Sequence, residues 1–183
     1  MLSCAEPSVE RDEELIERAN RGDAKAFEEL YRRYRDWVHR LAWRFTGDRQ
    51  DALDVVQETF IYLLKKFPGF RLTASMTTFL YPAVKHLSLN VRRRRAAGPV
   101  DETVLNEVPA SAPSQSSRAE LAAAMTSLPH DQREVVLMRF VDDMSLEEIA
   151  TGLQIPLGTV KSRLHNALRK LRDDPATREY FLA

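Results

Sequence analysis

Basic side chains are concentrated near the C-terminal end of the chain, in residues 159–172. The preceding stretch 131–148 carries six acids and two bases, so the sign of the charge reverses over a short distance. Lysine and arginine are suited to DNA phosphates and to base edges in the major groove. The pattern therefore favours recognition of DNA. The stretch 159–172 contains no acid, and its basic members are Lys161, Arg163, Arg169, Lys170 and Arg172, with His165 among them.

A helix-turn-helix is the element that would position these side chains. Ser145 is followed three residues later by Glu148, a capping box that predicts a helix over 146–152. A tight turn at 152–156 then leads into a longer helix at about 157–171, whose N-terminal residues would meet base edges. A charge run alone is more often a solvated face of an ordinary helical hairpin. The capping box, the turn length and the one-signed second helix together favour DNA binding.

A second one-signed segment lies in residues 61–95, which hold eight bases and no acid although the whole chain is neutral, with 27 bases and 27 acids. Its four consecutive arginines, 92–95, would neutralise phosphates, although cations also suit the C-terminal end of a helix. Nearby aromatic side chains would offer stacking surfaces to unstacked bases or would be core, and for Phe79 the core is favoured. These aromatic residues are Phe67, Phe70, Phe79 and Tyr81.

The predicted fold is all-α, with two small helical domains joined by a flexible linker and a helix-turn-helix in the second domain. Apolar residues recur at intervals of three and four, which predicts helices over 13–20, 24–45, 48–66 and 77–95 in a domain spanning 12–95. Pro82 should kink the last of these helices or delay its start. Residues 96–117 hold three prolines, four serines and no base, which predicts the linker before a domain at 118–175.

Several function classes are disfavoured. The single cysteine, Cys4, excludes an internal disulfide and favours a reducing compartment. No apolar run is long enough to span a membrane, and the acidic first 15 residues do not resemble a signal peptide, so a cytoplasmic protein is expected. We expect no metal, cofactor or enzymatic activity, because ligand pairs and phosphate loops are missing and no acid orients His165 beside Ser162.

Three segments carry a family resemblance. Residues 145–150 (SLEEIA) and 155–165 (IPLGTVKSRLH) resemble region 4 of bacterial extracytoplasmic-function (ECF) sigma factors, and 51–60 (DALDVVQETF) resembles the signature of their region 2. The similarity covers about 12–95 and 118–172. It implies a sigma factor that binds core RNA polymerase and directs promoter-specific transcription initiation at minus-ten and minus-thirty-five DNA elements. An anti-sigma factor is a further partner that the family implies.

The resemblance also implies site residues. Core polymerase binding falls on Asp54, Gln57 and Glu58, with Asp51 at the edge of that face. Minus-ten DNA falls on Phe70, Lys85, His86, Asn90, Arg92, Arg93 and Arg94. Minus-thirty-five DNA falls on Thr159, Lys161, Ser162, Arg163, His165 and Arg169, of which Arg163 and Arg169 would hold phosphates.

Some positions depart from the family pattern. Leu53 stands where a glutamate is usual, which would remove one polar contact to polymerase, and Pro82 replaces a helix-forming residue. His86 and Asn90 stand where Asn and Asp are common, so the minus-ten preference is open. Gln154 occupies a turn position at which we expect a positive φ.

The main alternative is a helix-turn-helix regulator that binds duplex DNA without polymerase. Such a regulator should carry a ligand pocket or a dimerisation helix in its N-terminal domain. The Asp-x-x-Gln-Glu helix joined to a basic helix favours the sigma factor.

Overall fold

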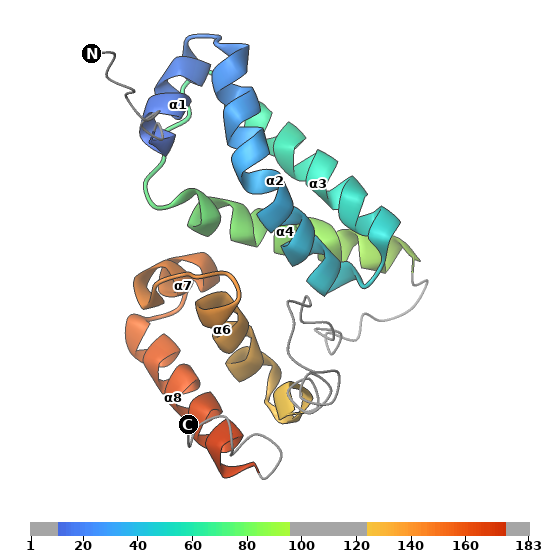
Figure 1. Ribbon diagram of the computed structural model, residues 1–183, viewed down its shortest axis with the longest axis vertical. Helices are drawn as coiled ribbons and strands as arrows, with labels where there is room; N and C mark the ends of the chain where they lie inside the picture. The colour runs from blue at the N-terminus through green and yellow to red at the C-terminus, as the bar shows by residue number, and fades with distance from the viewer. Residues whose placement is uncertain (1–10, 96–123, 175–183) are drawn as a thin grey trace, which may run out of the picture.

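The computed structural model describes residues 11–95 and 124–174, and those residues form helices and no strand (Figure 1). The prediction of an all-α chain is confirmed, and the predicted linker at 96–117 lies outside the described residues. The N-terminal helices are α1 (Asp12–Asn20), α2 (Ala24–Thr46), α3 (Arg49–Leu64) and α4 (Met76–Arg95). A helical stretch at 124–127 precedes α6 (His130–Phe140), α7 (Leu146–Leu153) and α8 (Leu157–Asp173).

The N-terminal bundle owes its boundaries to side chains that satisfy helix ends. Asp23 accepts hydrogen bonds from the backbone N–H groups of Lys25 and Ala26 at the start of α2, and Gly47 ends that helix with a φ of 65°. Asp48 caps α3 in the same way. Helices α2, α3 and α4 then pack around a shared apolar core, against which α1 also lies.

Pro82 lies inside α4 without delaying its start. The helix begins at Met76, one residue before the predicted start, because the Ser75 hydroxyl accepts a hydrogen bond from the Thr78 backbone N–H at 3.2 Å. That cap holds the first turn, while Pro82 removes only one backbone donor further along.

The C-terminal bundle contains the predicted helix-turn-helix. Both bonds of the capping box are present at α7: Ser145 N–H donates to Glu148 at 2.7 Å, and Glu148 N–H donates to the Ser145 hydroxyl at 3.1 Å. Three residues, 154–156, separate α7 from α8. Gln154 has a φ of 56°, so the expected left-handed turn position is confirmed.

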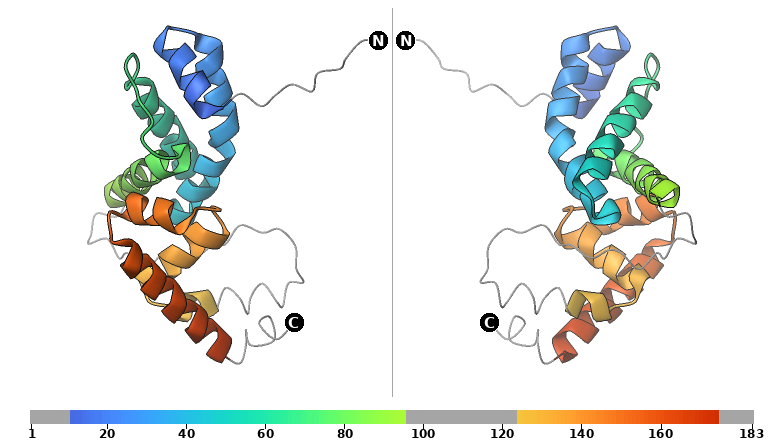
Figure 2. Two further views of the ribbon diagram at one scale, coloured as in Figure 1. Left: turned by 90° about the vertical axis from the view of Figure 1, so that its left-hand side faces the viewer. Right: turned by 90° about the vertical axis from the view of Figure 1, so that its right-hand side faces the viewer.

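The two bundles pack directly on one another, with α7 lying along α4 (Figure 2). One continuous apolar cluster includes Leu80 and Val84 of α4 together with Met138, Met144 and Ile149 of the C-terminal bundle. Each of these five side chains is at most 1% exposed. The packing therefore joins the two halves of the chain into one body.

Candidate functional site

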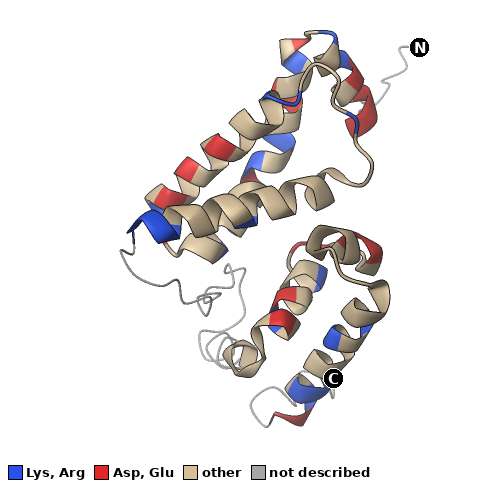
Figure 3. Ribbon diagram, turned by 180° about the vertical axis from the view of Figure 1, so that it is seen from behind, with Lys and Arg blue, Asp and Glu red and all other residues tan. Residues whose placement is uncertain are grey.

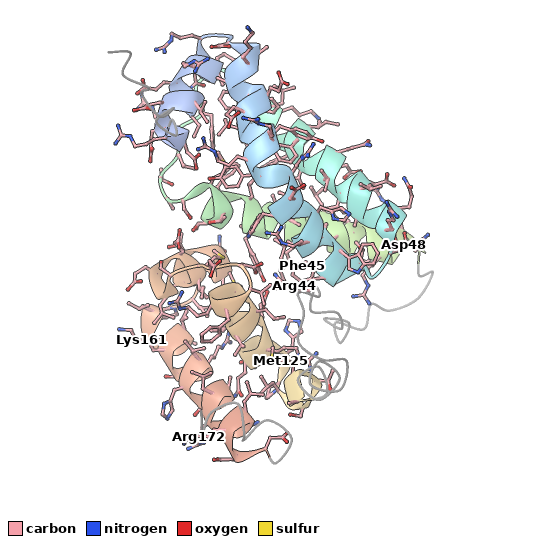
Figure 4. All side chains as sticks on the ribbon, viewed as in Figure 1. Arg44, Phe45, Asp48, Met125, Lys161 and Arg172 are labelled. Carbon is pink, nitrogen blue, oxygen red and sulfur yellow. The ribbon has the colours of Figure 1, made fainter. Side chains whose placement is uncertain are left out.

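Helix α8 separates a buried stripe from an exposed basic face. Val160, Ala167 and Leu171 are buried against the rest of the bundle, which turns the opposite side of the helix outward. Lys161 points away from the molecule in Figure 4. The exposed face presents one continuous set of predicted DNA-reading residues, and these are Lys161, Ser162, His165 and Arg169.

Two of the residues predicted to read DNA, Arg163 and Ser162, have partners within the bundle. Arg163 is half-buried, and its Nε lies 3.0 Å from a carboxylate oxygen of Asp131 on α6. The Ser162 hydroxyl donates to the Gly158 carbonyl at 2.9 Å. Thr159 is half-buried in the first turn of the helix. Of the two predicted phosphate ligands, Arg169 is thus the one held outward.

The C-terminal end of α4 is a basic end that lies beside the beginning of α3 (Figure 3). Arg93 and Arg94 are exposed, while Arg92 is half-buried. Arg95 differs from them because its Nη1 lies 3.0 Å from Asp48 and 2.8 Å from Asp51 on α3. The hydrogen bond that Arg95 donates to the Asp48 carboxylate, together with the negative charge of that carboxylate, raises the pKa of Arg95. Of the four arginines, Arg95 is therefore engaged with α3, whereas Arg93 and Arg94 are exposed.

In the middle of α4, before the arginines, the predicted minus-ten residues lie in two different surroundings. His86 is exposed, and the Asn90 amide nitrogen lies 3.3 Å from its Nδ1. Lys85 is half-buried, and its Nζ donates to the Glu134 carboxylate of α6 at 2.7 Å. The structure thus pairs one predicted DNA-binding group with the other bundle.

Phe67, Phe70 and Phe79, three of the predicted stacking aromatics, contact one another in the N-terminal bundle, whereas Tyr81 packs on Phe45. The Phe70 ring is 7% exposed and lies 5.4 Å from the Phe67 ring and 4.8 Å from the Phe79 ring, centroid to centroid. Phe79 is half-buried, as the core interpretation expected. Tyr81 is 1% exposed and its hydroxyl donates to Glu134 at 2.8 Å. In this arrangement the rings support the loop between α3 and α4 from within.

Asn20, at the end of α1, holds that loop in place and was missed by the sequence interpretation. Its side-chain oxygen accepts from the backbone N–H groups of Gly69 at 2.7 Å and Phe70 at 2.9 Å, and its amide nitrogen donates to the Phe70 carbonyl at 2.8 Å. Because the partners lie 49 and 50 residues away, no local spacing indicates the contact.

The outer side of α3 carries the predicted polymerase-binding residues. Asp54 and Gln57 are exposed and Glu58 is half-buried. Asp51 points inward, is 8% exposed and pairs with Arg95, so it serves the helix packing in this arrangement. Leu53, at which the loss of one polar contact to polymerase is expected, is 40% exposed. It adds an apolar position to the exposed face of α3.

Other kinds of site find no support in the described parts of the chain. Within residues 11–95 and 124–174 no group of three or more His, Cys, Asp or Glu side chains gathers as a metal site would. Among the same residues, no helix combines the length and the apolar character that crossing a membrane requires.

Comparison with known proteins yields two family matches. Residues 30–98 match Sigma-70 region 2, and residues 118–171 match Sigma-70, region 4. The chain is 36% identical over 159 residues to the ECF RNA polymerase sigma factor SigE of Mycolicibacterium smegmatis, with 81% of this chain and 61% of that relative covered. It is 33% identical over 174 residues to the RNA polymerase sigma-H factor of Pseudomonas aeruginosa, with 86% and 90% covered.

Solved structures share the fold. CnrH, in complex with the cytosolic domain of CnrY, aligns with a TM-score of 0.64 at 24% identity, covering 87% of this chain and 93% of CnrH. RpoE of Bartonella quintana, in complex with the anti-sigma factor NepR, aligns with a TM-score of 0.61 at 21% identity, covering 82% and 96%.

Proposed function

Since the chain belongs to the ECF class of RNA polymerase sigma factors, we propose that α3 binds core polymerase while α4 and α8 read the two elements of its promoters. The observation that carries the proposal is that two separate polar faces are exposed, one on α3 within the region 2 match and one on α8 within the region 4 match. The α3 face is acidic and amide-bearing, and the α8 face is basic. Residues 12–95 would act as region 2 and residues 118–175 as region 4, with 96–117 as the linker.

On α3 the supporting observation is the spacing of Asp54, Gln57 and Glu58. Residues three and four apart lie on one side of a helix, and this side is not used for packing within the described bundle. Leu53 and Ile61, which are 40% and 51% exposed, would add apolar contact area to the same interface. Asp51 would act by holding Arg95 and the end of α4 against α3.

For DNA, the supporting observation is that cations stand outward at both predicted sites. On α8, Lys161 and Ser162 would meet base edges with His165, while Arg169 would hold a phosphate. On α4, His86, Asn90 and the arginines 92–94 would contact the minus-ten element, joined by Lys85 once it leaves Glu134. Thr159, Arg163 and Phe70 would position the helices and the loop that carry these contacts.

The resemblance also supports an anti-sigma factor as a partner of this chain. We propose, in addition, that the protein acts by binding rather than as an enzyme, and that it acts in the cytoplasm, where the chromosome and polymerase are.

The test is transcription by core RNA polymerase on a promoter library, with and without the purified full-length chain. We expect a small set of promoters to fire only when the chain is present and to share two sequence elements. A chain that binds DNA but recruits no polymerase would instead be a helix-turn-helix regulator, and the proposed function would be wrong.

A further inference from the structure

An exposed aromatic ring, that of Tyr62, stands near the C-terminal end of α3 beside the start of the loop that leads to α4. Tyr62 is 38% exposed. The aromatic residues that the sequence offered as stacking surfaces are less open, since Phe70 is 7% and Tyr81 1% exposed, while Phe67 and Phe79 are half-buried. A base cannot stack on a ring that the protein already encloses. Among the five aromatic residues of the stretch 61–95, all of which the structure describes, Tyr62 is therefore the one whose ring is open to solvent.

The ring of Tyr62 is held in place by a chain of packed rings behind it. It stacks on Phe79, with ring centroids 6.0 Å apart and ring planes inclined at 15°. Phe79 lies 4.8 Å from Phe70, which lies 5.4 Å from Phe67, centroid to centroid. Phe67 in turn meets Phe27 of α2 edge-on at 5.9 Å. A ring that is fixed from behind loses little conformational freedom when a ligand stacks on it, so Tyr62 is a pre-organised platform.

Cations border the open part of this platform. Lys66, four residues further along, places its Nζ 4.6 Å from the centroid of the Tyr62 ring. Lys65, Lys66 and Arg71 are exposed, and the stretch 61–95 contains no acid that would repel a phosphate. A base stacks on an aromatic ring more strongly than an exposed ammonium group does, so a base can displace Lys66 from the ring. The displaced ammonium group then lies beside the platform, where a phosphate of the same strand can accept its hydrogen bond.

The platform also continues one face of α4. Phe79, His86, Asn90 and Arg93 follow one another at intervals of seven, four and three residues, which places them along one side of that helix. His86 and Arg93 are exposed, and Asn90 is half-buried. From Phe79 to Arg93 the helix rises by about 21 Å at 1.5 Å per residue. A strand that follows this face from Arg93 therefore arrives at Phe79 and at the Tyr62 ring stacked on it.

We propose that Tyr62 and Lys66 form a binding site for one unstacked base of single-stranded promoter DNA and for a neighbouring phosphate. The proposal rests on the proposed function, because it extends the minus-ten surface of α4 onto α3. Every base has a π-face, so this site adds affinity for the melted strand without selecting a sequence. It also separates single-stranded from duplex DNA, because a base inside a duplex must first leave its stack before it can reach the ring.

The first test measures how tightly the full-length chain binds DNA that contains no promoter. The probes are random single-stranded DNA of about 12 nucleotides and the same DNA as a duplex, read by fluorescence anisotropy. Tyr62→Leu keeps apolar bulk but removes the π-face, whereas Tyr62→Phe keeps the ring. Tyr62→Leu should bind the single strand about tenfold more weakly than wild type, and Tyr62→Phe should bind it like wild type. Both should bind the duplex like wild type, and an undiminished affinity of Tyr62→Leu for the single strand would overturn the proposal.

Two residues of α2 supply matched controls. Tyr31 is 37% exposed and its ring packs on Phe60 at 4.7 Å, so Tyr31→Leu removes a comparable ring from outside the acid-free stretch. Its single-strand affinity should stay at the wild-type value, and an equal loss in both leucine variants would contradict a local platform. Lys66→Gln should reduce the slope of log affinity against log salt concentration by about 0.7 in magnitude, whereas Lys25→Gln, at an exposed position, should not. An unchanged slope in Lys66→Gln would exclude its phosphate contact.

Photocrosslinking locates the stacked base without any variant. Single-stranded DNA of about 12 nucleotides that carries 5-iodouracil is irradiated together with the wild-type chain, and the crosslinked peptides are identified by mass spectrometry. A crosslink should map to Tyr62. Crosslinks that all map elsewhere would refute the platform, whatever the variants do. Thermal melts of each variant show whether the N-terminal bundle remains folded.

Two further measurements separate this site from the polymerase face and from the proposed function. Tyr62→Leu should bind core RNA polymerase like wild type, and a weaker complex would assign Tyr62 to the polymerase-binding face of α3 instead. Transcription by the wild-type holoenzyme tests the proposed function independently. A chain that stacks a base on Tyr62 but never directs initiation would refute the proposed function and leave the single-strand site established.

Discussion

Arg44 and Asp142 form a buried ion pair between residues that lie 98 positions apart, with Nη2 and Oδ2 separated by 2.5 Å. Burial raises the pKa of Asp142, and the positive charge of Arg44 opposes that rise. Neither residue carries a local signal for such a pairing. Arg44 sits near the end of α2, and Asp142 occupies the turn between α6 and α7. Because both side chains are buried, the pair shows that the two bundles are in direct contact at this point.

Replacing Asp142 alone should open the chain without unfolding region 2. Asp142→Asn leaves the buried Arg44 charge without its counter-charge, which costs about 3–5 kcal/mol while the interface stays closed. Opening exposes Arg44 to water and avoids that cost. Both tryptophans of the chain, Trp37 and Trp43, lie in α2 and report on region 2 alone. Their fluorescence melt should shift little. Energy transfer between dyes on cysteines that replace the exposed Asp36 on α2 and Asp173 on α8, in a Cys4→Ser background, should fall. A large loss of region 2 stability would contradict the expectation.

The double substitution Asp54→Ala with Gln57→Ala should weaken binding to core polymerase. Both side chains are exposed on α3, and truncating polar groups at the centre of an interface typically costs about 1–3 kcal/mol each. Fluorescence anisotropy measures the affinity, and a melting curve checks the fold. Glu28→Ala with Asp36→Ala, on exposed positions of α2, is the control. Unchanged affinity in the α3 variant would remove the basis for its role in polymerase binding.

Lys161→Ala should change the sequence preference of DNA binding, whereas Arg169→Ala should change only its overall affinity. Lys161 stands at the start of α8, where a recognition helix meets base edges, so its loss should lower promoter binding and relax the preference at one or two base pairs by about 1–3 kcal/mol. Arg169 lies two turns further along, so Arg169→Ala should lower the affinity for all DNA sequences equally. The slope of log affinity against log salt concentration should become smaller in magnitude by about one unit. Titrations against matched and mismatched upstream elements at several salt concentrations separate these effects. Equal losses for every sequence in Lys161→Ala would make its role electrostatic.

Asn20→Ala should loosen the loop between α3 and α4. The substitution removes two accepted bonds and one donated bond, and leaving the backbone groups of Gly69 and Phe70 unpaired costs about 1–3 kcal/mol. Urea unfolding measures the loss, and faster hydrogen exchange at the two amides locates it. Asn20→Asp keeps the accepting oxygens and should retain most of the protection at both amides. Equal exchange in wild type and Asn20→Ala would show that the clamp contributes nothing.

Limited proteolysis should cut first within 96–117, because a segment rich in proline and serine and poor in large apolar residues does not bury a core. Two fragments of region 2 and region 4 should result. The closed interface predicts that they elute together, and that Glu134→Gln with Asp142→Asn separates them. Cleavage within α2 before 96–117 would contradict the predicted division of the chain.

Local patterns in the sequence were enough to predict the helices and most of their exposed faces. Capping residues such as Asp23 and Ser145 act within three residues, and amphipathic spacing fixes which side of α8 is buried. The same spacing predicted that Asp54 and Gln57 share a face of α3. The ion pair between Asp51 and Arg95 has no such local signal, because the two residues lie 44 positions apart.

The sequence by itself determined an all-helical chain with a helix-turn-helix and two segments of one-signed charge, because helix periodicity, capping and charge runs are local properties. Only the tertiary structure decided that Glu134 pairs with Lys85, that Asn20 clamps the loop at Phe70, and that Arg44 meets Asp142. These contacts join side chains separated by about 50 to 98 residues, and they form only where packing of the shared apolar core brings distant helix faces together. Spacing along a chain carries no information about such pairs.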